Sequence, residues 1–319
     1  MSTISVVIPC YNGEAYIGQA LESVRAQTRQ PQEILVINDG STDRTADVAR
    51  SFDEVRLLDN SVNMGPSVTR NRALIEARGN TVAFLDADDV WLPHHLETVV
   101  GLLEEHPDAG VAFSAVEFFG EREGVWHAGR LPEAEPTDAF WECLRHTTVP
   151  QMSVVVRRSS LALVGGWQQP SPIHRTAADY DVWLRLSLHT PFIATHEVTA
   201  RYRWHPGQIS QTLRNDQISS VYYSRRRILY ELGRESADDR YGDVAKKIRE
   251  YWIDDYLQAF HARDLERARV LENLRRWLFP AMRVPGKIRL RSLMPETVIR
   301  AFDNVRGAHP STSPPHPPD

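Results

Sequence analysis

The sequence predicts an α/β fold with a doubly wound, mainly parallel sheet and a mostly helical C-terminal extension. Two observations lead to this prediction. Over residues 4–107, apolar segments of strand length alternate with segments of helical periodicity. The apolar segments also lack alternation with polar residues, which is typical of parallel strands buried between two layers of helices.

Four strands and four helices account for this first part of the chain. We expect strands at ISVVIPC, EILVIND, VRLLDN and TVAFLDAD, which are residues 4–10, 33–39, 55–60 and 81–88. We expect helices after them, at residues 14–28, 41–52, 66–79 and 93–107. In the first helix, four apolar residues recur at the spacing of one helical face, namely Ile17, Ala20, Leu21 and Val24.

The pattern changes after residue 110. We expect further strands at residues 111–119 and 151–158, a tight turn at GGW (165–167), a helix at residues 179–188, and a strand that enters a loop at residues 201–210. Residues from about 215 onward favour helices, and the proline-rich end is typical of disorder. The expected domains are a catalytic domain at 1–212 with halves at 1–110 and 111–212, a helical region at 213–308, and a disordered tail at 309–319.

Composition narrows the class of protein. The chain has 319 residues, of which 42% are hydrophobic and 25% charged, so a globular protein of one or two domains is expected. A net charge of −5 does not indicate nucleic-acid binding. Cys10 and Cys143 are too few for a disulfide framework, which indicates a reducing compartment. No signal peptide or membrane-spanning run is recognisable, so we expect a cytoplasmic protein.

Carboxylates gather at the end of the fourth predicted strand. Polar residues follow three of the strands, at PCYN, NDGSTD and DADD, and the carboxyl ends of such strands are where open α/β sheets bind ligands. Asp86, Asp88 and Asp89 supply the hard oxygen ligands that Mg²⁺ and Mn²⁺ prefer. The alternative is that Asp88 or Asp89 caps the helix near Pro93.

Two further segments carry candidate site residues. Asp39 in INDGSTD can accept a hydrogen bond from a nucleobase, although Asp, Gly and Ser are also common in plain βα turns. Arg70 in NMGPSVTRNRA can bind a phosphate through its guanidinium fork, and the alternative is a solvated helix face. Glycine-rich dinucleotide, P-loop and GxSxG motifs are absent from the sequence, which counts against dehydrogenases and most ATP-driven enzymes.

Taken in order, these motifs resemble those of the family 2 inverting glycosyltransferases, which have the type A nucleotide-sugar transferase fold. The resemblance covers about residues 3–212, through VVIPCYNGEAYIGQALESVRAQT, EILVINDGSTDRT, NMGPSVTRNRAL, FLDADD, GGW, ADYDVWLRL and RYRWHPGQIS. It implies metal-dependent transfer of a sugar from a nucleotide-diphospho-sugar donor to a saccharide or lipid-linked saccharide acceptor. The process implied is synthesis of cell-surface polysaccharide or glycoconjugate, and the cofactor is Mg²⁺ or Mn²⁺. No oligomeric state is implied.

The resemblance also implies which residues bind the nucleotide. Pro9 and Tyr11 would line the base, and Asp39 would form a hydrogen bond with it. Arg70 would lie by the phosphates. Asp86 would contact the ribose or a metal-bound water. The sequence departs from the family at residue 38, where Asn38 stands in place of a frequent acid.

The remaining implied roles concern the metal and the catalytic base. Asp88 would bind the divalent metal, and His205 in YRWHPG would contact the metal or the diphosphate, unless it is a structural loop histidine. Asp179 stands where the family has its catalytic base, preceded by Ala178 instead of the usual Glu. An acid there can also serve to stabilise the helix dipole, which would lower its pKa. Asp181 is expected to point to a different side of the helix.

Two other functions compete with the one implied by the resemblance. FLDADDV fits the Asp-x-Asp motif of phosphatases of the haloacid dehalogenase type, although that motif usually opens the fold. A non-catalytic nucleotide-sugar-binding or membrane-surface adaptor is the second. Residues 263–291 are rich in arginine and lysine, with an apolar helical face formed by Leu265, Ala268, Leu271, Leu274 and Leu278. Such segments can bind the inner membrane face peripherally, and the alternative is a helix packed on the catalytic domain.

Overall fold

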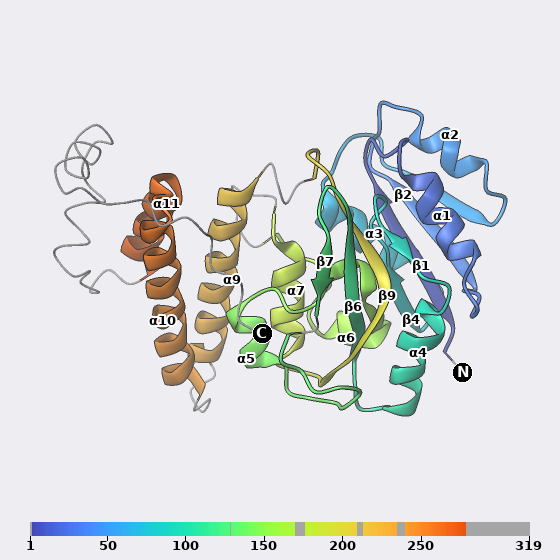
Figure 1. Cartoon of the computed structure of the whole chain (residues 1–319). Helices are drawn as coiled ribbons and strands as arrows, with labels where there is room; N and C mark the ends of the chain where they lie inside the picture. The colour runs from blue at the N-terminus through green and yellow to red at the C-terminus, as the bar shows by residue number, and fades with distance from the viewer. Residues whose placement is uncertain (1, 128, 170–175, 209–212, 235–239, 279–319) are drawn as a thin grey trace. The chain divides into compact units, whose positions relative to one another are not determined.

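The structure is a computed structural model, and it describes residues 2–127, 129–169, 176–208, 213–234 and 240–278. The chain divides into two compact units between Ile248 and Arg249, and each is described by itself. In the first unit, a nine-stranded sheet lies between two layers of helices (Figure 1). The boundary falls well after residue 212, so α9 (Arg214–Arg234) belongs to the same unit as the sheet.

The sheet is mainly parallel, as predicted. Its strands are β1 (Ile4–Cys10), β2 (Glu33–Asn38), β3 (Val55–Asp59), β4 (Thr81–Phe84), β5 (Val90–Trp91), β6 (Val111–Gly120), β7 (Gly124–Trp126), β8 (Val155–Arg157) and β9 (Phe192–Trp204). Their order is β3-β2-β1-β4-β8-β6-β9-β5, with β7 paired to β6. β1 to β4 run parallel to one another. β8 lies between β4 and β6 and is antiparallel to both. β9 runs parallel to β6.

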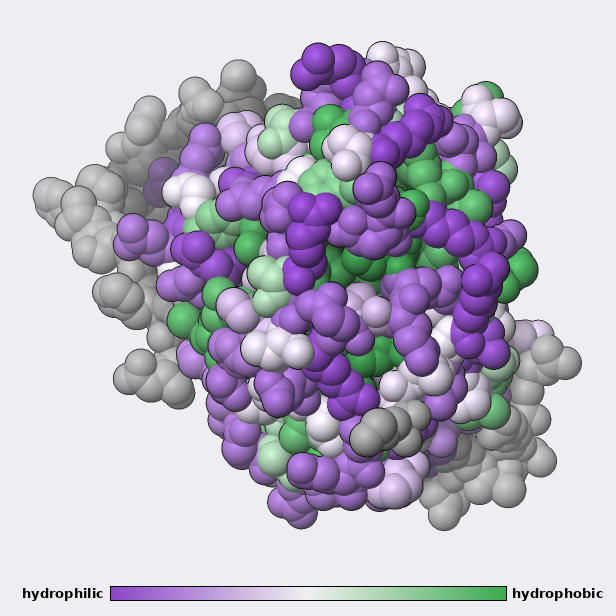
Figure 2. Space-filling model, turned by 90° about the vertical axis from the view of Figure 1, so that its right-hand side faces the viewer, coloured by the Kyte–Doolittle hydropathy of each residue, from purple (hydrophilic) through white to green (hydrophobic). Residues whose placement is uncertain are grey.

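Helices cover both faces of the sheet, which explains the unbroken apolar strands. The helices of the first unit are α1 (Ile17–Arg25), α2 (Thr45–Arg50), α3 (Pro66–Glu76), α4 (His95–Glu105), α5 (Phe140–Arg145), α6 (Arg158–Leu163), α7 (Ala178–Leu186) and α9. α1, α2 and α4 share a core with alternate residues of β1, among them Ile4, Val6 and Ile8. α3, α6 and α7 lie on the opposite side (Figure 1). Hydrophilic residues dominate the outer surface on the side of α1 and α2 (Figure 2).

Four strands end at one edge of the sheet and deliver the candidate site residues there. β1, β2 and β4 are parallel neighbours, and they end just before Tyr11, Asp39 and Leu85. Two successive antiparallel pairings, β4 with β8 and β8 with β6, restore the direction of β4 in β6. Because β9 is parallel to β6, it also ends at this edge, just before His205.

Several boundaries differ from the sequence prediction. β4 stops at Phe84 instead of residue 88, because the chain turns there and the Asp89 amide donates to the Asp86 carbonyl at 3.1 Å. Residues 151–153 form a 3₁₀ turn, so only Val155–Arg157 belong to β8. β9 begins at Phe192, well before the predicted start at residue 201. Its exposed polar residues His196 and Glu197 interrupt the apolar pattern there.

The pairing of β6 with β9 contains bulges. β6 advances from Ser114 to Val116 while β9 advances from Thr195 to Ala200. The extra residues lie on β9, where they interrupt the regular ladder. Beyond the bulges the register is regular, from Val116 and Ala200 to Gly120 and Trp204.

The second unit contains most of α10 (Arg240–His261) and α11 (Leu265–Leu278). Trp252 stacks on Tyr256 with ring centroids 5.0 Å apart, and its indole N–H donates to the Leu271 carbonyl at 2.7 Å. Ala268, Leu271 and Leu274 are buried, which favours the alternative that this apolar face packs within the protein. The rest of the proposed membrane segment, 279–291, and the tail, 309–319, lie outside the described residues.

Peripheral membrane contact therefore stays a prediction. Among the described residues, no helix combines the length and the apolar composition that crossing a membrane requires.

Candidate active site

Asp39 is buried at the end of β2 and organises the loop that precedes α3. Only 4% of its surface is exposed. Its carboxylate accepts hydrogen bonds from the amides of Met64 and Gly65, at 2.9 and 2.8 Å, and from the Asn60 side chain at 2.7 Å. A carboxylate offers about four acceptor positions, so one remains. Asp39 is thus more than a residue of a plain βα turn.

Asn38 has a defined partner that explains the departure from an acid at this position. Its side-chain amide donates to the Asp59 carboxylate at 2.7 Å, and its carbonyl oxygen accepts from the Ser41 amide at 3.2 Å. An aspartate at position 38 would oppose two carboxylates at this distance. On the neighbouring strand β1, Pro9 is half-buried. Tyr11, which follows β1 at the same edge of the sheet, is exposed.

Arg70 pairs with Asp86 next to the end of β4. The guanidinium of Arg70 lies 2.7 Å from an Asp86 oxygen, and only 8% of the arginine is exposed. A solvated helix face is therefore excluded for Arg70. The Nε atom of Arg70 is buried without a hydrogen-bond partner in the described structure, so the guanidinium retains donor capacity.

Asp88 pairs with His205, which comes from the end of β9. The Nε2 atom of His205 lies 3.1 Å from an Asp88 oxygen. The ring of His205 also lies against that of Tyr16, with centroids 4.9 Å apart. Burial, together with the neighbouring charge of Asp86, raises the pKa of Asp88. His205 is thus brought to the carboxylate cluster rather than to an isolated loop.

The carboxylates do not cap the following helix. α4 begins at His95, and its preceding residue His94 forms no side-chain cap. Asp89 is instead buried and accepts from the Arg203 backbone amide at 2.8 Å. Burial raises the pKa of Asp89 well above its ordinary value. The capping alternative for DADD is therefore wrong.

Asp88 and His205 have the chemistry of a site for a divalent cation. Imidazole and carboxylate are both ligands of Mn²⁺, and carboxylate is a ligand of Mg²⁺. Within the described ranges, no group of three His, Cys, Asp or Glu residues converges as a ligand cluster. A cation held by this pair would take its other ligands from a diphosphate and water, which suits these ions.

Asp179 lies in the first turn of α7, within the electric field of the Arg70–Asp86 pair. Burial raises the pKa of Asp179, the charge of Arg70 lowers it and that of Asp86 raises it. The expected fall from the helix dipole is therefore outweighed by burial. The preceding Ala177 has a left-handed backbone with φ of 54°, which marks an abrupt entry into the helix.

Asp181 is removed from this group. It is 1% exposed and forms an ion pair with Arg185 at 2.8 Å. As expected from the helical spacing, Asp181 points to a different side of the helix and lies in the interior, whereas Asp179 is only partly buried.

One residue of the site escaped the sequence analysis. Arg203 donates to the Asp88 carbonyl at 2.8 Å and to the Gln19 side chain, and it lies over the Tyr16 ring. It therefore ties β9 to the carboxylate turn and to the start of α1. A signal was present, because Arg203 shares the strand face of His205 two residues later.

Known proteins with similar sequences are glycosyltransferases. Residues 5–164 match the family described as glycosyl transferase family 2. The putative teichuronic acid biosynthesis glycosyltransferase TuaG of Bacillus subtilis is 30% identical over 206 residues, which cover 63% of this chain and 78% of TuaG. An uncharacterized glycosyltransferase of Haemophilus influenzae is 25% identical over 269 residues, covering 79% of this chain and 81% of the relative.

Solved structures share the fold. Residues 1–349 of S. aureus TarS in complex with UDP-GlcNAc match with a TM-score of 0.69 at 21% identity, covering 90% of this chain and 83% of the TarS chain. The mannosyltransferase PcManGT from Pyrobaculum calidifontis, in complex with GDP-Man and Mn²⁺, matches with a TM-score of 0.56 at 16% identity. The match covers 95% of this chain and 87% of the PcManGT chain. Together with the family match over half of the chain, these findings identify the protein as a glycosyltransferase that belongs to glycosyl transferase family 2.

Proposed function

We propose that the protein is a metal-dependent, inverting glycosyltransferase that moves one sugar from a nucleoside-diphosphate sugar to a hydroxyl of a saccharide acceptor. The observation that carries the proposal is the grouping of charges at one sheet edge. The Asp88–His205 pair joins distant parts of the chain, the Arg70–Asp86 pair lies next to it in sequence, and Asp179 lies in the field of the second pair. A cation-binding pair, a phosphate-binding arginine and a separate carboxylate base suit this reaction.

The donor nucleotide occupies the N-terminal half in this proposal. Pro9 and Tyr11 line the base, and Asp39 accepts one hydrogen bond from it. Because three protein donors already fill most of the Asp39 carboxylate, one ring N–H is the partner that fits. The N3–H of uracil is such a partner, whereas guanine presents two donors side by side. The complex of TarS with UDP-GlcNAc supports a uridine donor.

The diphosphate binds next to Arg70 and the Asp88–His205 pair. Arg70 keeps an unpaired buried Nε, which can donate to a phosphate oxygen. Asp86 holds Arg70 in place and lies at the ribose. Asp88 and His205 would hold Mg²⁺ or Mn²⁺, and the bound cation would neutralise the charge that develops on the departing diphosphate. PcManGT, which contains Mn²⁺ in its complex, supports a divalent ion.

Asp179 acts as the general base. Its carboxylate takes the proton of the acceptor hydroxyl while the hydroxyl oxygen bonds to the anomeric carbon. The bond from that carbon to the diphosphate oxygen breaks, and the nucleoside diphosphate leaves. Attack from the face opposite the leaving group inverts the anomeric centre. The raised pKa of Asp179 brings it closer to the pH at which a base works well.

The acceptor belongs to cell-surface polymer synthesis in this proposal, which the similarity to TuaG supports. The test is a donor screen with saccharide acceptors, followed by Asp179→Asn in the active combination. We expect this variant to bind the donor normally and to turn over at least about a hundredfold more slowly. Normal turnover would exclude Asp179 as the base, and a product that retains the anomeric configuration would exclude the inverting mechanism.

A further inference from the structure

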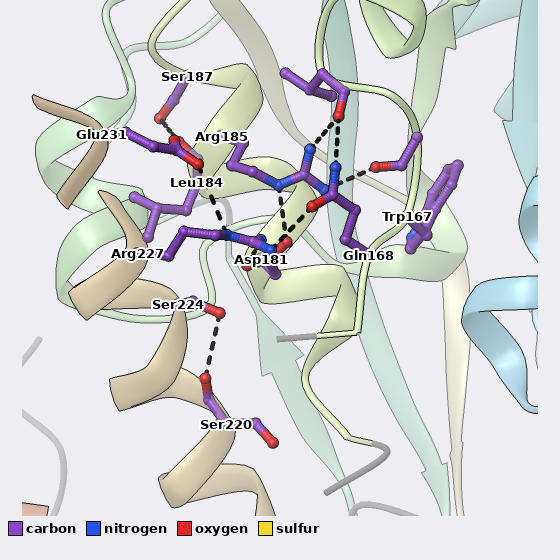
Figure 3. A network of polar contacts seen from close by, with 12 residues as sticks. Trp167, Gln168, Asp181, Leu184, Arg185, Ser187, Ser220, Ser224, Arg227 and Glu231 are labelled. Atoms are coloured by element: carbon purple, nitrogen blue, oxygen red, sulfur yellow. Dashed lines mark hydrogen bonds and ion pairs between the residues drawn. The ribbon is translucent and has the colours of Figure 1, made fainter. Parts of the chain in front are cut away.

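A buried charged network lies directly behind Asp179. Asp181, two residues along α7, pairs with Arg185 of the same helix and with Arg227 of α9 (Figure 3). A carboxylate with 1% exposure requires such partners, because an unpaired charge in the interior is strongly unfavourable. Arg227 also donates to the Gln168 side chain at 3.0 Å. α9 is therefore fixed to α7 and to the chain that follows the GGW turn.

Arg185 extends the network to the GGW turn itself. Its guanidinium donates to the carbonyls of Val164 and Gly166, at 2.5 and 2.7 Å. Gly165 and Gly166 both have left-handed backbones, with φ of 67° and 71°. Glycine adopts this conformation without the strain that other residues would have. The two hydrogen bonds from Arg185 hold the turn in place.

The far end of the turn is held by α3, on the donor side of the site. The side-chain amide of Asn71 bonds both backbone groups of Trp167, donating to its carbonyl at 2.6 Å and accepting from its amide at 2.8 Å. Asn71 follows Arg70 directly in α3. The Trp167 ring packs between Phe84 of β4 and Trp183 of α7. The turn thus links the helix of Asp179 to the helix of Arg70.

A second arginine of α9 secures the other neighbour of Asp179. Burial raises the pKa of Tyr180 to about 12, so its hydroxyl stays protonated, and it donates to the Leu144 carbonyl at 3.0 Å. The Nε atom of Arg225 donates to both the Tyr180 hydroxyl and the Leu144 carbonyl, at 3.2 and 3.0 Å. The two residues that follow Asp179 are therefore each held by an arginine of α9.

We propose that Arg185, Arg225 and Arg227 are positioning residues that hold Asp179 at a fixed place relative to Arg70. The proposal rests on the role proposed above for Asp179 as the base. A base must lie within hydrogen-bond distance of the proton it takes, and a displacement of about 1 Å can cost about a hundredfold in rate. Because α9 lies beyond the matched residues 5–164, the catalytic unit extends further along the chain than the family motif.

The test is a double-mutant cycle on kcat and on donor affinity. Arg227→Met removes one partner of Asp181 and leaves Arg185. We expect kcat to fall at least about tenfold, with donor affinity nearly unchanged, because Arg227 contacts none of the donor residues. In an Asp179→Asn background the same change should lower kcat by less than about twofold, because the group through which Arg227 acts is already lost. An equal fall in both backgrounds overturns the proposal.

Two further variants make the cycle decisive. Arg227→Lys keeps the positive charge beside Asp181, so it can replace Arg227→Met in the same cycle if Arg227→Met does not fold. We expect a smaller fall in kcat for Arg227→Lys, again only when Asp179 is present. Arg226→Met changes an exposed arginine of the same helix and should leave kcat unchanged. Normal turnover of Asp179→Asn would mean that the proposed base is wrong. Slow turnover of Asp179→Asn with normal turnover of both Arg227 variants would overturn the positioning role alone.

Discussion

At the residue scale, the proposed metal dependence rests on Asp88. Asp88→Asn keeps the size of the side chain but removes the negative charge toward a cation, so we expect most of the transfer activity to be lost while the fold survives. Excess chelator should have the same effect on the unmodified enzyme. Activity assays with Mg²⁺ or Mn²⁺ measure both, and Asp108→Asn, at an exposed position, serves as the control. Full activity in excess chelator would contradict the prediction.

Asp39 leads to a prediction about the nucleobase. With one acceptor position left, the carboxylate suits the single N3–H of uracil, so we expect UDP to bind more tightly than GDP or CDP. Asp39→Ala should weaken UDP binding by about 1–3 kcal/mol, the cost of a buried partner left unpaired. Isothermal titration calorimetry measures both effects. Asn60→Ala, which removes one of the internal donors and leaves the carboxylate, should weaken binding less. Equal affinity for UDP before and after Asp39→Ala would exclude the proposed contact.

Asp179 leads to a prediction about pH. Its pKa lies above the ordinary value of about 3.9 because burial and the charge of Asp86 outweigh the effect of Arg70. The base works only when ionised, so turnover should fall as the pH falls through this raised pKa and should be constant above it. A profile of kcat against pH measures the position of the acid limb. In Asp179→Asn the residual activity should lack that limb; an unchanged limb would assign it to another group.

The sequence singled out most residues of the candidate site but not their partners. Asp39, Asp86 and Asp88 stood out because each follows an apolar strand, and that local pattern is visible without a structure. The pairing of Asp88 with His205 joins residues more than a hundred positions apart, and it depends on the direction of β9 in the sheet. The local sequence carries no information on that direction. The bond between Asn38 and Asp59 was hidden for the same reason.

At the element scale, α7 depends on Asp181 for its attachment. Asp181→Asn leaves two arginines without their buried counter-charge, and breaking a buried ion pair in this way costs about 3–5 kcal/mol. Urea unfolding followed by tryptophan fluorescence should show the loss. Asp47→Asn is the matched control, because Asp47 pairs with Arg50 at 3.5 Å on the surface and such pairs contribute at most about 1 kcal/mol. Equal stability of the two variants would contradict the prediction.

Elements with a regular pattern were predicted, and short ones were not. The helix at 179–188 was expected from its apolar spacing, and α7 spans Ala178–Leu186. α5, β5 and β7 are too short to show a period, and their positions follow from contacts with neighbouring elements. Residues 151–156 are all buried, so burial alone does not separate the 3₁₀ turn from β8. The carbonyl of Met152, in the 3₁₀ turn, accepts a hydrogen bond from the Trp91 indole instead of pairing with a neighbouring strand.

At the scale of the whole molecule, we expect the stability of the C-terminal unit and the affinity for the donor to be independent of each other. Leu271 is fully buried there, and Leu271→Ala should cost about 2–5 kcal/mol through the cavity it leaves. UDP affinity should stay the same, because all proposed donor residues lie before residue 248. Thermal unfolding and calorimetry measure the two effects, with Leu163→Ala, at an exposed position, as the control. A parallel loss of UDP affinity would show coupling.

The class of the fold was predictable from alternation and burial, whereas the strand order was not. Parallel strands with helices between them follow from the sequence of residues 4–107. The antiparallel insertion of β8 between β4 and β6 depends on long-range pairing, and so does the late return of β9 to the edge of the site. α9, which belongs to the first unit, is joined to α7 by buried charges, and a packing contact of this kind shows no pattern in the sequence.

The bulges between β6 and β9 have a consequence for insertions and deletions. Side chains of a strand alternate between two faces, so the count of residues along β9 decides which face His205 occupies. Deleting Glu197, an exposed residue within the bulged stretch, would shift the following residues by one position. His205 would then turn away from Asp88, and Pro206 would take its place. A change of length in this exposed stretch would therefore disrupt the proposed metal site, unless a second change of one residue restores the parity.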